Sequence, residues 1–192
     1  MADGDRAVAN FLFEAGTLKL HKRTGWWIAG VKDPESVAEH SWRAALLASI
    51  IAELEGADPA KAALLSVWHD TGETRTGDLA HISQKYVGKG DTERIAADQS
   101  QGMPAGLGAL MRSIIGEYEA RETPEAICAG DADKLECLIQ ALEYQDQGHK
   151  NVDRWIVNSQ KRIRTESARR LAEELLKTGT LTWLREAMGE SK

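Results

Sequence analysis

Apolar residues recur at spacings of three and four along most of this chain, and no other feature constrains the fold as strongly. Between Ser36 and Ala52 the inward positions would form one stripe along a helix, consisting of Val37, His40, Ala44, Leu47, Ala48 and Ile51. Similar stripes run through residues 8–18, 59–69 and 104–118. We find no run that alternates apolar and polar residues between turn signals, as a half-buried strand would. The sequence therefore predicts an all-α fold.

Several expected helices begin at residues that cap a first turn. Ser36 and Glu39 form the S-x-x-E pattern of a capping box. Asp58 and Thr123 each stand directly before a proline, the combination of an N-cap residue with proline at the first helical position. We expect an ordered loop over residues 21–35 and helices over residues 8–18, 36–52, 59–71, 92–99, 104–118, 124–145, 152–177 and 181–188.

The length of the chain favours one domain over residues 1–192, because 192 residues can bury a sizeable core and no repeat or Pro/Ser-rich linker divides them. The longest apolar run, Ala44 to Ala52, is far shorter than the roughly 20 residues of a membrane span. The acidic N-terminus does not resemble a secretory signal. We therefore expect a cytoplasmic protein with no membrane partner, in which Cys128 and Cys137 are reduced thiols.

Charge and motifs exclude several classes of function. The net charge of −6 does not draw nucleic acid to the surface, and the basic run from Lys161 to Arg170 is interrupted by Glu166, as on a solvated helix face. We therefore expect no nucleic-acid polymer as partner. Phosphate-loop, dinucleotide-binding and serine-hydrolase motifs are absent from the sequence.

The remaining candidates for functional residues are imidazoles and carboxylates that lie on the apolar stripes. His40 lies on the stripe of its helix, and His69 and Asp70 end the next one within "SVWHDTGETRTGDL". Each has a structural interpretation: His40 as a core histidine, and His69 as a histidine favoured by the dipole at a helix C-terminus. Asp133 in "DADKLECLIQALEY" is a fourth candidate, with Asp131 as its competitor.

Asp133 also has a structural interpretation, because Lys134 and Glu136 beside it are compatible with a solvated helix face. Two imidazole nitrogens and two carboxylates would suit a divalent transition ion, with positions left for water and a substrate oxygen. Spacing alone leaves the two interpretations open.

The order His40, His69-Asp70, Asp133 resembles the H…HD…D signature of the HD-domain metal-dependent phosphohydrolases. The stretches "RTGWW", "PESVAEHSWR", "HDTGETRTGDL" and "DADKLECLIQALEY" resemble blocks of the YfbR-type 5'-deoxynucleotidases and their eukaryotic and archaeal HD-domain relatives. These blocks cover residues 18–147, whereas the expected C-terminal helices in 148–192 carry little specific resemblance. The resemblance implies an HD-domain helical bundle with a metal site between helices, and a homodimer.

The same resemblance assigns roles to individual residues. It implies that one divalent ion (Mn, Co, Zn, Fe or Ni) is held by His40, His69, Asp70 and Asp133. Catalysis would depend on Glu73, which would orient or deprotonate a water, and on Asp70. The expected substrate-binding residues are Arg23 for the phosphate, Trp26 against the sugar and Asp78 at the 3'-hydroxyl. Trp27 is an alternative to Trp26. Glu73 and Arg23 can also be surface residues, and either tryptophan a core residue.

The function implied is removal of the 5'-phosphate from (deoxy)nucleoside monophosphates by a phosphoric monoester hydrolase. One alternative keeps the site but takes nucleoside triphosphates or a modified nucleotide of a biosynthetic pathway. Another is a non-catalytic, nucleotide-binding regulatory HD module. HD-fold proteins with two metals carry extra histidines between the HD pair and the last aspartate, where this chain has only His81. We therefore expect a single metal ion.

Overall fold

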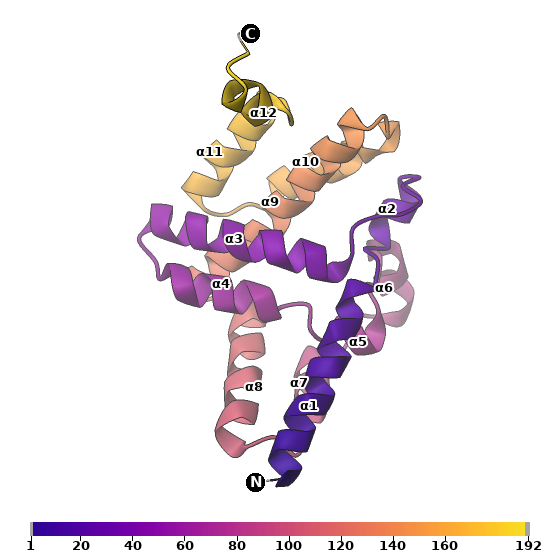
Figure 1. The fold of residues 1–192 in the computed structure, drawn as a ribbon, viewed down its shortest axis with the longest axis vertical. Helices are drawn as coiled ribbons and strands as arrows, with labels where there is room; N and C mark the ends of the chain where they lie inside the picture. Colours follow the sequence, from indigo (N-terminus) through magenta and orange to yellow (C-terminus); the bar gives the residue numbers. More distant parts are fainter. Residues whose placement is uncertain (1, 191–192) are drawn as a thin grey trace.

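The computed structural model describes residues 2–190, and Figure 1 shows that this part of the chain is an assembly of helices. Within that range the only β pairing is an isolated antiparallel bridge between Lys22 and Ser36. The prediction of an all-α fold is confirmed. The elements are α1 (Ala2–Gly16), η1 (Thr17–Lys19), α2 (Gly25–Ile28), α3 (Val37–Glu55), α4 (Pro59–Trp68), α5 (Glu73–Thr76), α6 (His81–Val87), α7 (Thr92–Gln99), α8 (Ala105–Ala120), α9 (Pro124–Asp146), η2 (Lys150–Val152), α10 (Asp153–Lys161), α11 (Glu166–Leu175) and α12 (Thr182–Ala187).

The three central helices begin where their capping residues predict. Ser36 accepts a hydrogen bond from the backbone N–H of Glu39, whose side chain accepts one from the backbone of Ser36, so the capping box is complete. Asp58 accepts from the first-turn amides of α4 and Thr123 from that of Ala126 in α9. Because these caps fix the first turn of each helix, they also fix the register of the side chains that follow.

The core is formed mainly by α3, α4 and α9. Figure 1 shows α3 and α4 side by side, and both pack against α9. Ile51, Leu65 and Leu135, one from each helix, are fully buried in the largest apolar cluster. Burial of a side chain of this size contributes about 1.5–3 kcal/mol. This packing fixes the relative positions of the three helices that carry the expected metal ligands.

The expected single helix over residues 152–177 is wrong, because the chain breaks between α10 and α11. The carboxylate of Asp131 on α9 accepts hydrogen bonds from the backbone amides of Arg164 and Thr165 and from the Thr165 hydroxyl, at 2.6–3.0 Å. Two amides that point at a buried carboxylate cannot continue the hydrogen-bond ladder of α10. The helix therefore stops, turns and restarts at Glu166.

Two further expectations need correction. Leu12, expected on the buried stripe of the first helix, is 64% exposed, and that helix begins earlier than expected, as α1. The loop over residues 21–35 contains the single turn of α2, and residues 81–87 form the helix α6, which the sequence did not indicate.

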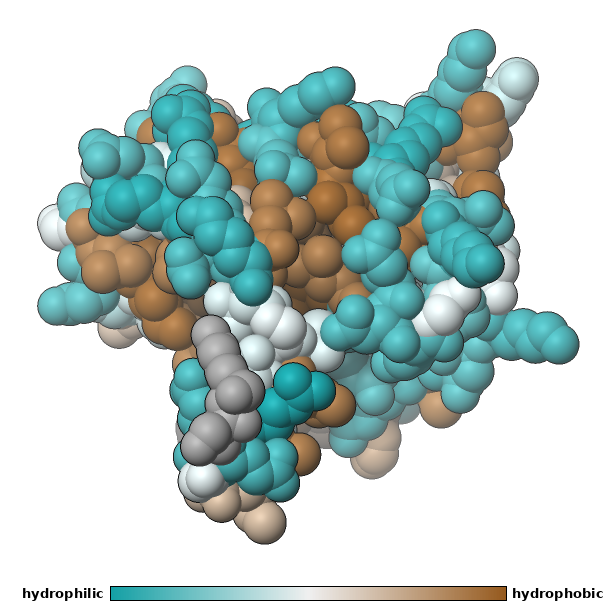
Figure 2. Space-filling view, turned by 90° about the horizontal axis from the view of Figure 1, so that it is seen from above, coloured by the Kyte–Doolittle hydropathy of each residue, from teal (hydrophilic) through white to brown (hydrophobic). Residues whose placement is uncertain are grey.

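The surface combines polar helices with exposed apolar side chains. Figure 2 looks along the long axis from the end where α11 and α12 lie, and shows hydrophobic side chains gathered in a hollow between hydrophilic rims. Leu176 after α11, Leu181 before α12 and Trp183 in α12 are exposed. No helix among the described residues is long and apolar enough to cross a bilayer. Cys128 and Cys137 are free cysteines, as expected.

Candidate active site

The four expected metal ligands come from three elements that meet at the ends of α3 and α4 and in the middle of α9. His40 lies in the first turn of α3 and is fully buried. His69 is the residue that caps the C-terminus of α4, with Asp70 directly after it. Asp133 lies on α9 and is buried. The caps at Ser36 and Asp58 fix the register of α3 and α4, and the packing of these helices against α9 then brings His40 and Asp133, more than 90 positions apart, to the same point.

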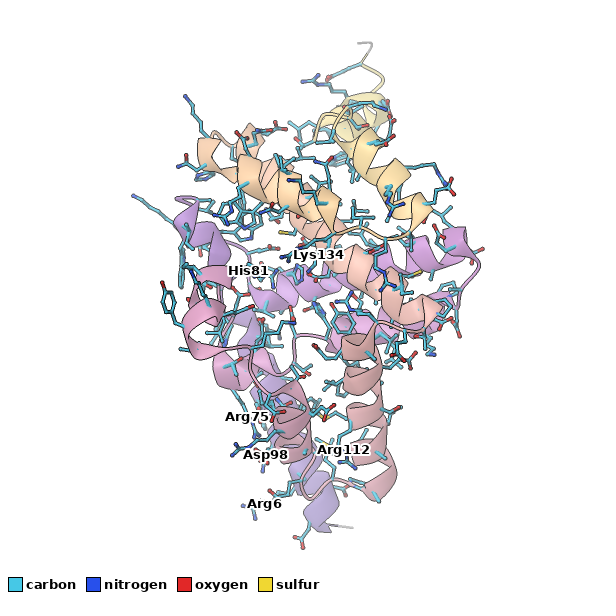
Figure 3. All side chains as sticks on the ribbon, turned by 180° about the vertical axis from the view of Figure 1, so that it is seen from behind. Arg6, Arg75, His81, Asp98, Arg112 and Lys134 are labelled. Atoms are coloured by element: carbon cyan, nitrogen blue, oxygen red, sulfur yellow. The ribbon has the colours of Figure 1, made fainter. Side chains whose placement is uncertain are left out.

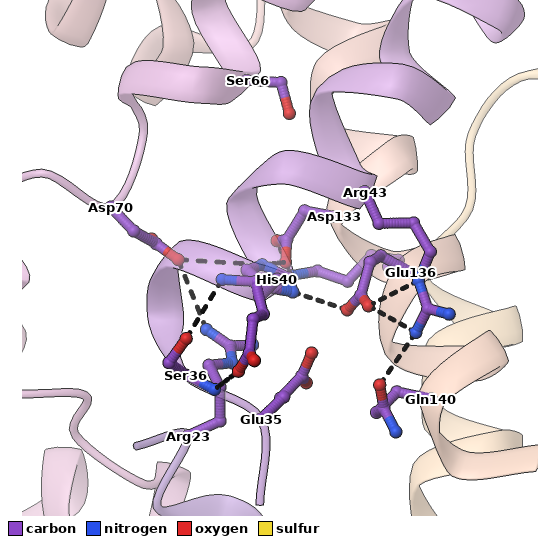
Figure 4. A network of polar contacts seen from close by, with 12 residues as sticks. Arg23, Glu35, Ser36, His40, Arg43, Ser66, Asp70, Asp133, Glu136 and Gln140 are labelled. Atoms are coloured by element: carbon purple, nitrogen blue, oxygen red, sulfur yellow. Dashed lines mark hydrogen bonds and ion pairs between the residues drawn. The ribbon is translucent and has the colours of Figure 1, made fainter. Parts of the chain in front are cut away.

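The ligand atoms of these residues lie close together (Figure 4 shows Asp70, His40 and Asp133). One nitrogen of each histidine and one oxygen of Asp133 lie within 4.8 Å of one another. Asp70 borders this set, with its Oδ2 3.0 Å from His69 Nε2 and 3.7 Å from His40 Nε2. Asp133 Oδ1 is 3.4 Å from His40 Nε2. These distances leave room for an ion between the atoms.

The hydrogen bonds of the two imidazoles test whether a cation fits. Nδ1 of His69 lies 2.5 Å from the carbonyl oxygen of Ser66, and Nδ1 of His40 lies 2.5 Å from Glu136 Oε2. Both partners accept hydrogen bonds, so each Nδ1 carries a proton. When such a ring is neutral, its lone pair therefore lies on Nε2. Both Nε2 atoms are buried without a hydrogen-bond partner. Lone pairs and carboxylates that converge in this way fit a divalent cation.

Electrostatics in the cluster also favour positive charge at its centre. Burial and the nearby Arg23 oppose protonation of His40, but Glu136 and Asp133 raise its pKa to about 10. Burial disfavours the ionised form of Asp133 as well, yet Lys134 and His40 hold the pKa of this carboxyl well below its usual range. Without an ion, a proton on His40 offsets the carboxylates, and a divalent cation would take its place.

Arg23 lies at the edge of the cluster as a cation with acidic neighbours. Its NH1 is 3.3 Å from Asp70 Oδ2 and 3.3 Å from Asp78 Oδ1. Although burial opposes the charge, Asp78 and Asp70 raise the pKa of Arg23 further above its usual range. Asp78 also accepts hydrogen bonds from the backbone N–H and the hydroxyl of Thr24, at 2.6 and 2.9 Å. Asp78 therefore anchors the loop that carries the guanidinium beside the cluster.

Glu73 begins the single turn α5, just after Asp70, and its Oε2 is buried without a hydrogen-bond partner. Burial and the charge of Asp70 raise the pKa of Glu73 to about 9, although Arg23 opposes this effect. A partly buried carboxylate with an unused oxygen beside a candidate cation site is suited to hold a water molecule and to exchange a proton with it.

The two tryptophans have different environments. Trp26 is buried, packs against Tyr144 and Trp155, and donates from Nε1 to Glu35 Oε1 at 2.9 Å. Trp27 is 53% exposed. The structure thus places Trp26 in a core cluster next to the site. A contact of Trp26 with a sugar stays a prediction.

Glu136 is the main residue of this region that sequence reasoning missed. The sequence is compatible with a solvated helix face that includes Glu136, but this residue is fully buried and lies against His40. Its spacing of three from Asp133 was the available signal, because residues i and i+3 share a helix face. The competitor Asp131 is occupied by the start of α11, as described above. Figure 3 shows Lys134 and His81 from behind, and His81 contacts Arg162 at 3.2 Å outside the ligand cluster.

An all-α bundle with two imidazoles and two carboxylates around one point defines a class of helical proteins with a metal site between helices. Comparison with known proteins assigns the family. The chain belongs to the HD domain family, whose model matches residues 15–175.

Relatives and solved structures agree with this assignment. The chain is 31% identical to human 5'-deoxynucleotidase HDDC2, over 77% of this chain and 72% of the relative. It is similar to a conserved hypothetical protein of Pyrococcus furiosus, with a TM-score of 0.73, 31% identity and coverage of 88% and 99% of the two chains. A structure titled "Predicted metal-dependent phosphohydrolase" from Magnetospirillum magnetotacticum MS-1 has a TM-score of 0.64, with 27% identity and coverage of 91% and 96%.

Proposed function

We propose that this protein is a metal-dependent phosphohydrolase that removes the 5'-phosphate from deoxynucleoside monophosphates. The proposal rests on three buried acceptor atoms without hydrogen-bond partners near Arg23, which are Nε2 of His40, Nε2 of His69 and Oε2 of Glu73. It is supported by the 31% identity of the chain to the human 5'-deoxynucleotidase. Two imidazoles and two carboxylates suit Mn²⁺, Co²⁺, Fe²⁺, Ni²⁺ or Zn²⁺. In this proposal His40, His69, Asp70 and Asp133 hold one such ion.

In this proposal, the residues around the ion have separate roles in binding the phosphate, activating the water and recognising the sugar. When bound, a divalent ion neutralises phosphate charge, lowers the pKa of the attacking water and offsets the acidic cluster that holds Glu73 protonated. Arg23 binds non-bridging phosphate oxygens through its planar fork of donors. Glu73 orients the water through Oε2 and accepts its proton as the oxygen–phosphorus bond forms. Asp78 keeps Arg23 in place and accepts a hydrogen bond from the 3'-hydroxyl, while Trp26 limits the space beside the sugar.

Phosphate release from matched nucleotides tests this function. Protein stripped with a chelator is given Mn²⁺, Co²⁺ or Zn²⁺ and then ribo- or deoxyribonucleoside 5'-monophosphates of each base. We expect metal-dependent release of inorganic phosphate with a preference for the deoxy substrates. Pyrophosphate release from triphosphates alone would instead indicate a different substrate. Tight nucleotide binding with no release under any metal would indicate a regulatory module.

A homodimer is the assembly we propose for this chain. Four large apolar side chains on α3, spaced four residues apart, are exposed: Trp42, Leu46, Ile50 and Leu54. Leu64 and Val67 on the adjacent α4 are exposed as well. A single-sided stripe of this kind fits a second copy of the same stripe across a twofold axis. The cytoplasmic location stays a prediction.

A further inference from the structure

A buried carboxylate supports His40 from the side away from the cluster. Glu136 lies one turn after Asp133 on α9 and is fully buried, as His40 is. Its Oε2 is 2.5 Å from His40 Nδ1 (Figure 4). The nitrogen that faces this carboxylate is therefore not the nitrogen that faces Asp70 and Asp133. Glu136 contacts His40 without belonging to the expected ligand set.

The other oxygen of Glu136 is held by Arg43, which follows His40 by three residues on α3. Arg43 donates to Glu136 Oε1 from Nε at 3.0 Å and from NH2 at 2.8 Å. It also donates to Gln140 at 2.8 Å and to Glu143 at 2.6 Å, both on α9. Each carboxylate oxygen of Glu136 thus has its own partner, and the guanidinium is fixed by further residues of the same helix.

Donor and acceptor roles in this chain of contacts follow from chemistry. A guanidinium only donates hydrogen bonds, so Oε1 of Glu136 must accept. Oε2 accepts a hydrogen bond from the N–H group at Nδ1 of His40. Because the proton stays on Nδ1, the neutral ring keeps a lone pair on Nε2. We infer that Glu136 is a positioning residue that fixes His40 in the tautomer able to bind the metal, and that Arg43 fixes Glu136. The inference rests on the metal-dependent function proposed above.

Replacing Glu136 by glutamine tests the role of the hydrogen bond at nearly constant volume. Arg43 can face only the amide oxygen, so the amide nitrogen must turn toward Nδ1 of His40 and donate to it. The lone pair then lies on Nδ1 and the proton on Nε2, where the metal should bind. We expect E136Q to bind Co²⁺ about 10–100-fold more weakly than the wild type, the usual effect of losing such a partner. The measurement is a titration of the metal-stripped protein, followed by the visible absorption of Co²⁺.

A second substitution distinguishes this role from simple packing. In the double variant E136Q/R43M no donor constrains the amide, so its oxygen can turn to His40 and accept from Nδ1. We expect the double variant to recover most of the lost Co²⁺ affinity. R43M alone should lose less affinity than E136Q, because a carboxylate that is held less firmly can still accept the hydrogen bond from Nδ1 of His40. Arg43 and Gln140 line an open groove of about 770 Å³ beside Trp42, so methionine can be accommodated there. A packing role predicts the opposite, that the double variant is at least as impaired as E136Q.

Melting curves of the metal-stripped variants show whether each one folds. In the Zn²⁺-loaded wild type, ¹⁵N-edited spectra give a measurement that needs no variant: His40 should bind through Nε2 and show a slowly exchanging Nδ1 proton. Binding through Nδ1, or unchanged affinity in folded E136Q, would overturn the inference even if the wild type releases phosphate. A wild type that binds no Co²⁺, Mn²⁺ or Zn²⁺ would overturn the proposed function as well.

Discussion

Residues in the candidate site differ in which of their polar atoms already have a hydrogen-bond partner. His69 and His40 each commit Nδ1 to a structural acceptor, whereas Glu73 has an oxygen without any partner. The first arrangement suits a ligand, because it holds the ring without engaging the metal-facing nitrogen. The second suits a group that exchanges protons. Metal binding and proton transfer should therefore respond separately to substitution.

Replacing Glu73 by glutamine should separate the two roles. We expect the turnover number to fall about 10²–10⁴-fold, because an amide cannot accept a proton from water. The affinity for Co²⁺ should change little, since Glu73 is not among the proposed ligands. Steady-state phosphate release and Co²⁺ titration measure the two quantities. Glu93→Gln, at an exposed position of α7, is the matched control. Full turnover by the Glu73 variant would refute its assigned role.

Helix boundaries that depend on nearby residues can be predicted from the sequence, whereas those that depend on residues far away in the chain cannot. The starts of α3, α4 and α9 were predictable, because Ser36, Asp58 and Thr123 cap amides within three residues of themselves. The break before α11 was not, because it depends on Asp131, more than 30 positions away. The same holds within the site: His40 was visible on its stripe, whereas its contact with Glu136 required the packing of α3 against α9.

Removing the carboxylate of Asp131 should weaken the α10–α11 junction without changing the site. Asp131→Ala leaves the amides of Arg164 and Thr165 without their acceptor, and we expect the free energy of unfolding to fall by about 2–3 kcal/mol. Urea unfolding measures this loss. Glu173→Ala, at an exposed position on α11, should have a much smaller effect. Equal Co²⁺ affinity in both variants is expected, and a lost metal site in Asp131→Ala would contradict the separation of the two aspartates.

Glu14 joins the helices α1, α5 and α7, and its contacts give a pH prediction. Its carboxylate, on α1, accepts hydrogen bonds from Arg75, Thr74 and Gln99, and Arg75 is the main cause that lowers its pKa from 4.5 to about 2. Figure 3 shows Arg75 in this region. Because the folded pKa is the lower one, Glu14 stabilises the fold above about pH 4.5, and the contribution is lost as the pH falls through about 2.

Glu14→Gln should therefore reduce stability at pH 7 and flatten its dependence on pH in acid. We expect a loss of roughly 1 kcal/mol after allowance for solvent screening of this partly exposed group. The difference from the wild type should shrink between pH 4.5 and 2. Urea unfolding at several pH values measures the difference, with Glu93→Gln as control. A difference that grows in acid would contradict the assignment.

Across the molecule, the blocks that resemble the family and the packing of the helices locate the candidate site, and the apolar stripe on α3 bears on the proposed dimer. The candidate site was predictable because the blocks over residues 18–147 contain the proposed ligands and the helix caps that position them. The exposed stripe was not, since Leu46 and Ile50 follow the same helical spacing as core residues. Only the packing of α3 against α4 and α9 distinguishes its two apolar faces.

Charges on the α3 stripe should separate the proposed dimer. We expect the wild type to have the mass of two chains in sedimentation equilibrium, and the double variant Leu46→Glu/Ile50→Glu to have the mass of one, because two facing stripes would bury like charges. Leu110→Glu on α8, half exposed in the structure, is the control and should stay dimeric. A wild type with the mass of one chain at all concentrations would refute the dimer.

Metal-dependent hydrolysis at this site can be tested by comparing Asp70→Ala with Asp98→Ala, which replaces an exposed aspartate on α7. Each metal-stripped protein is titrated with Co²⁺ and then assayed for phosphate release from deoxyadenosine 5'-monophosphate, with and without the ion. We predict that Asp70→Ala binds no Co²⁺ in the range where the wild type saturates and releases no phosphate, whereas Asp98→Ala matches the wild type. Phosphate release by the metal-free Asp70→Ala protein would contradict a site in which this carboxylate holds the ion that hydrolysis requires.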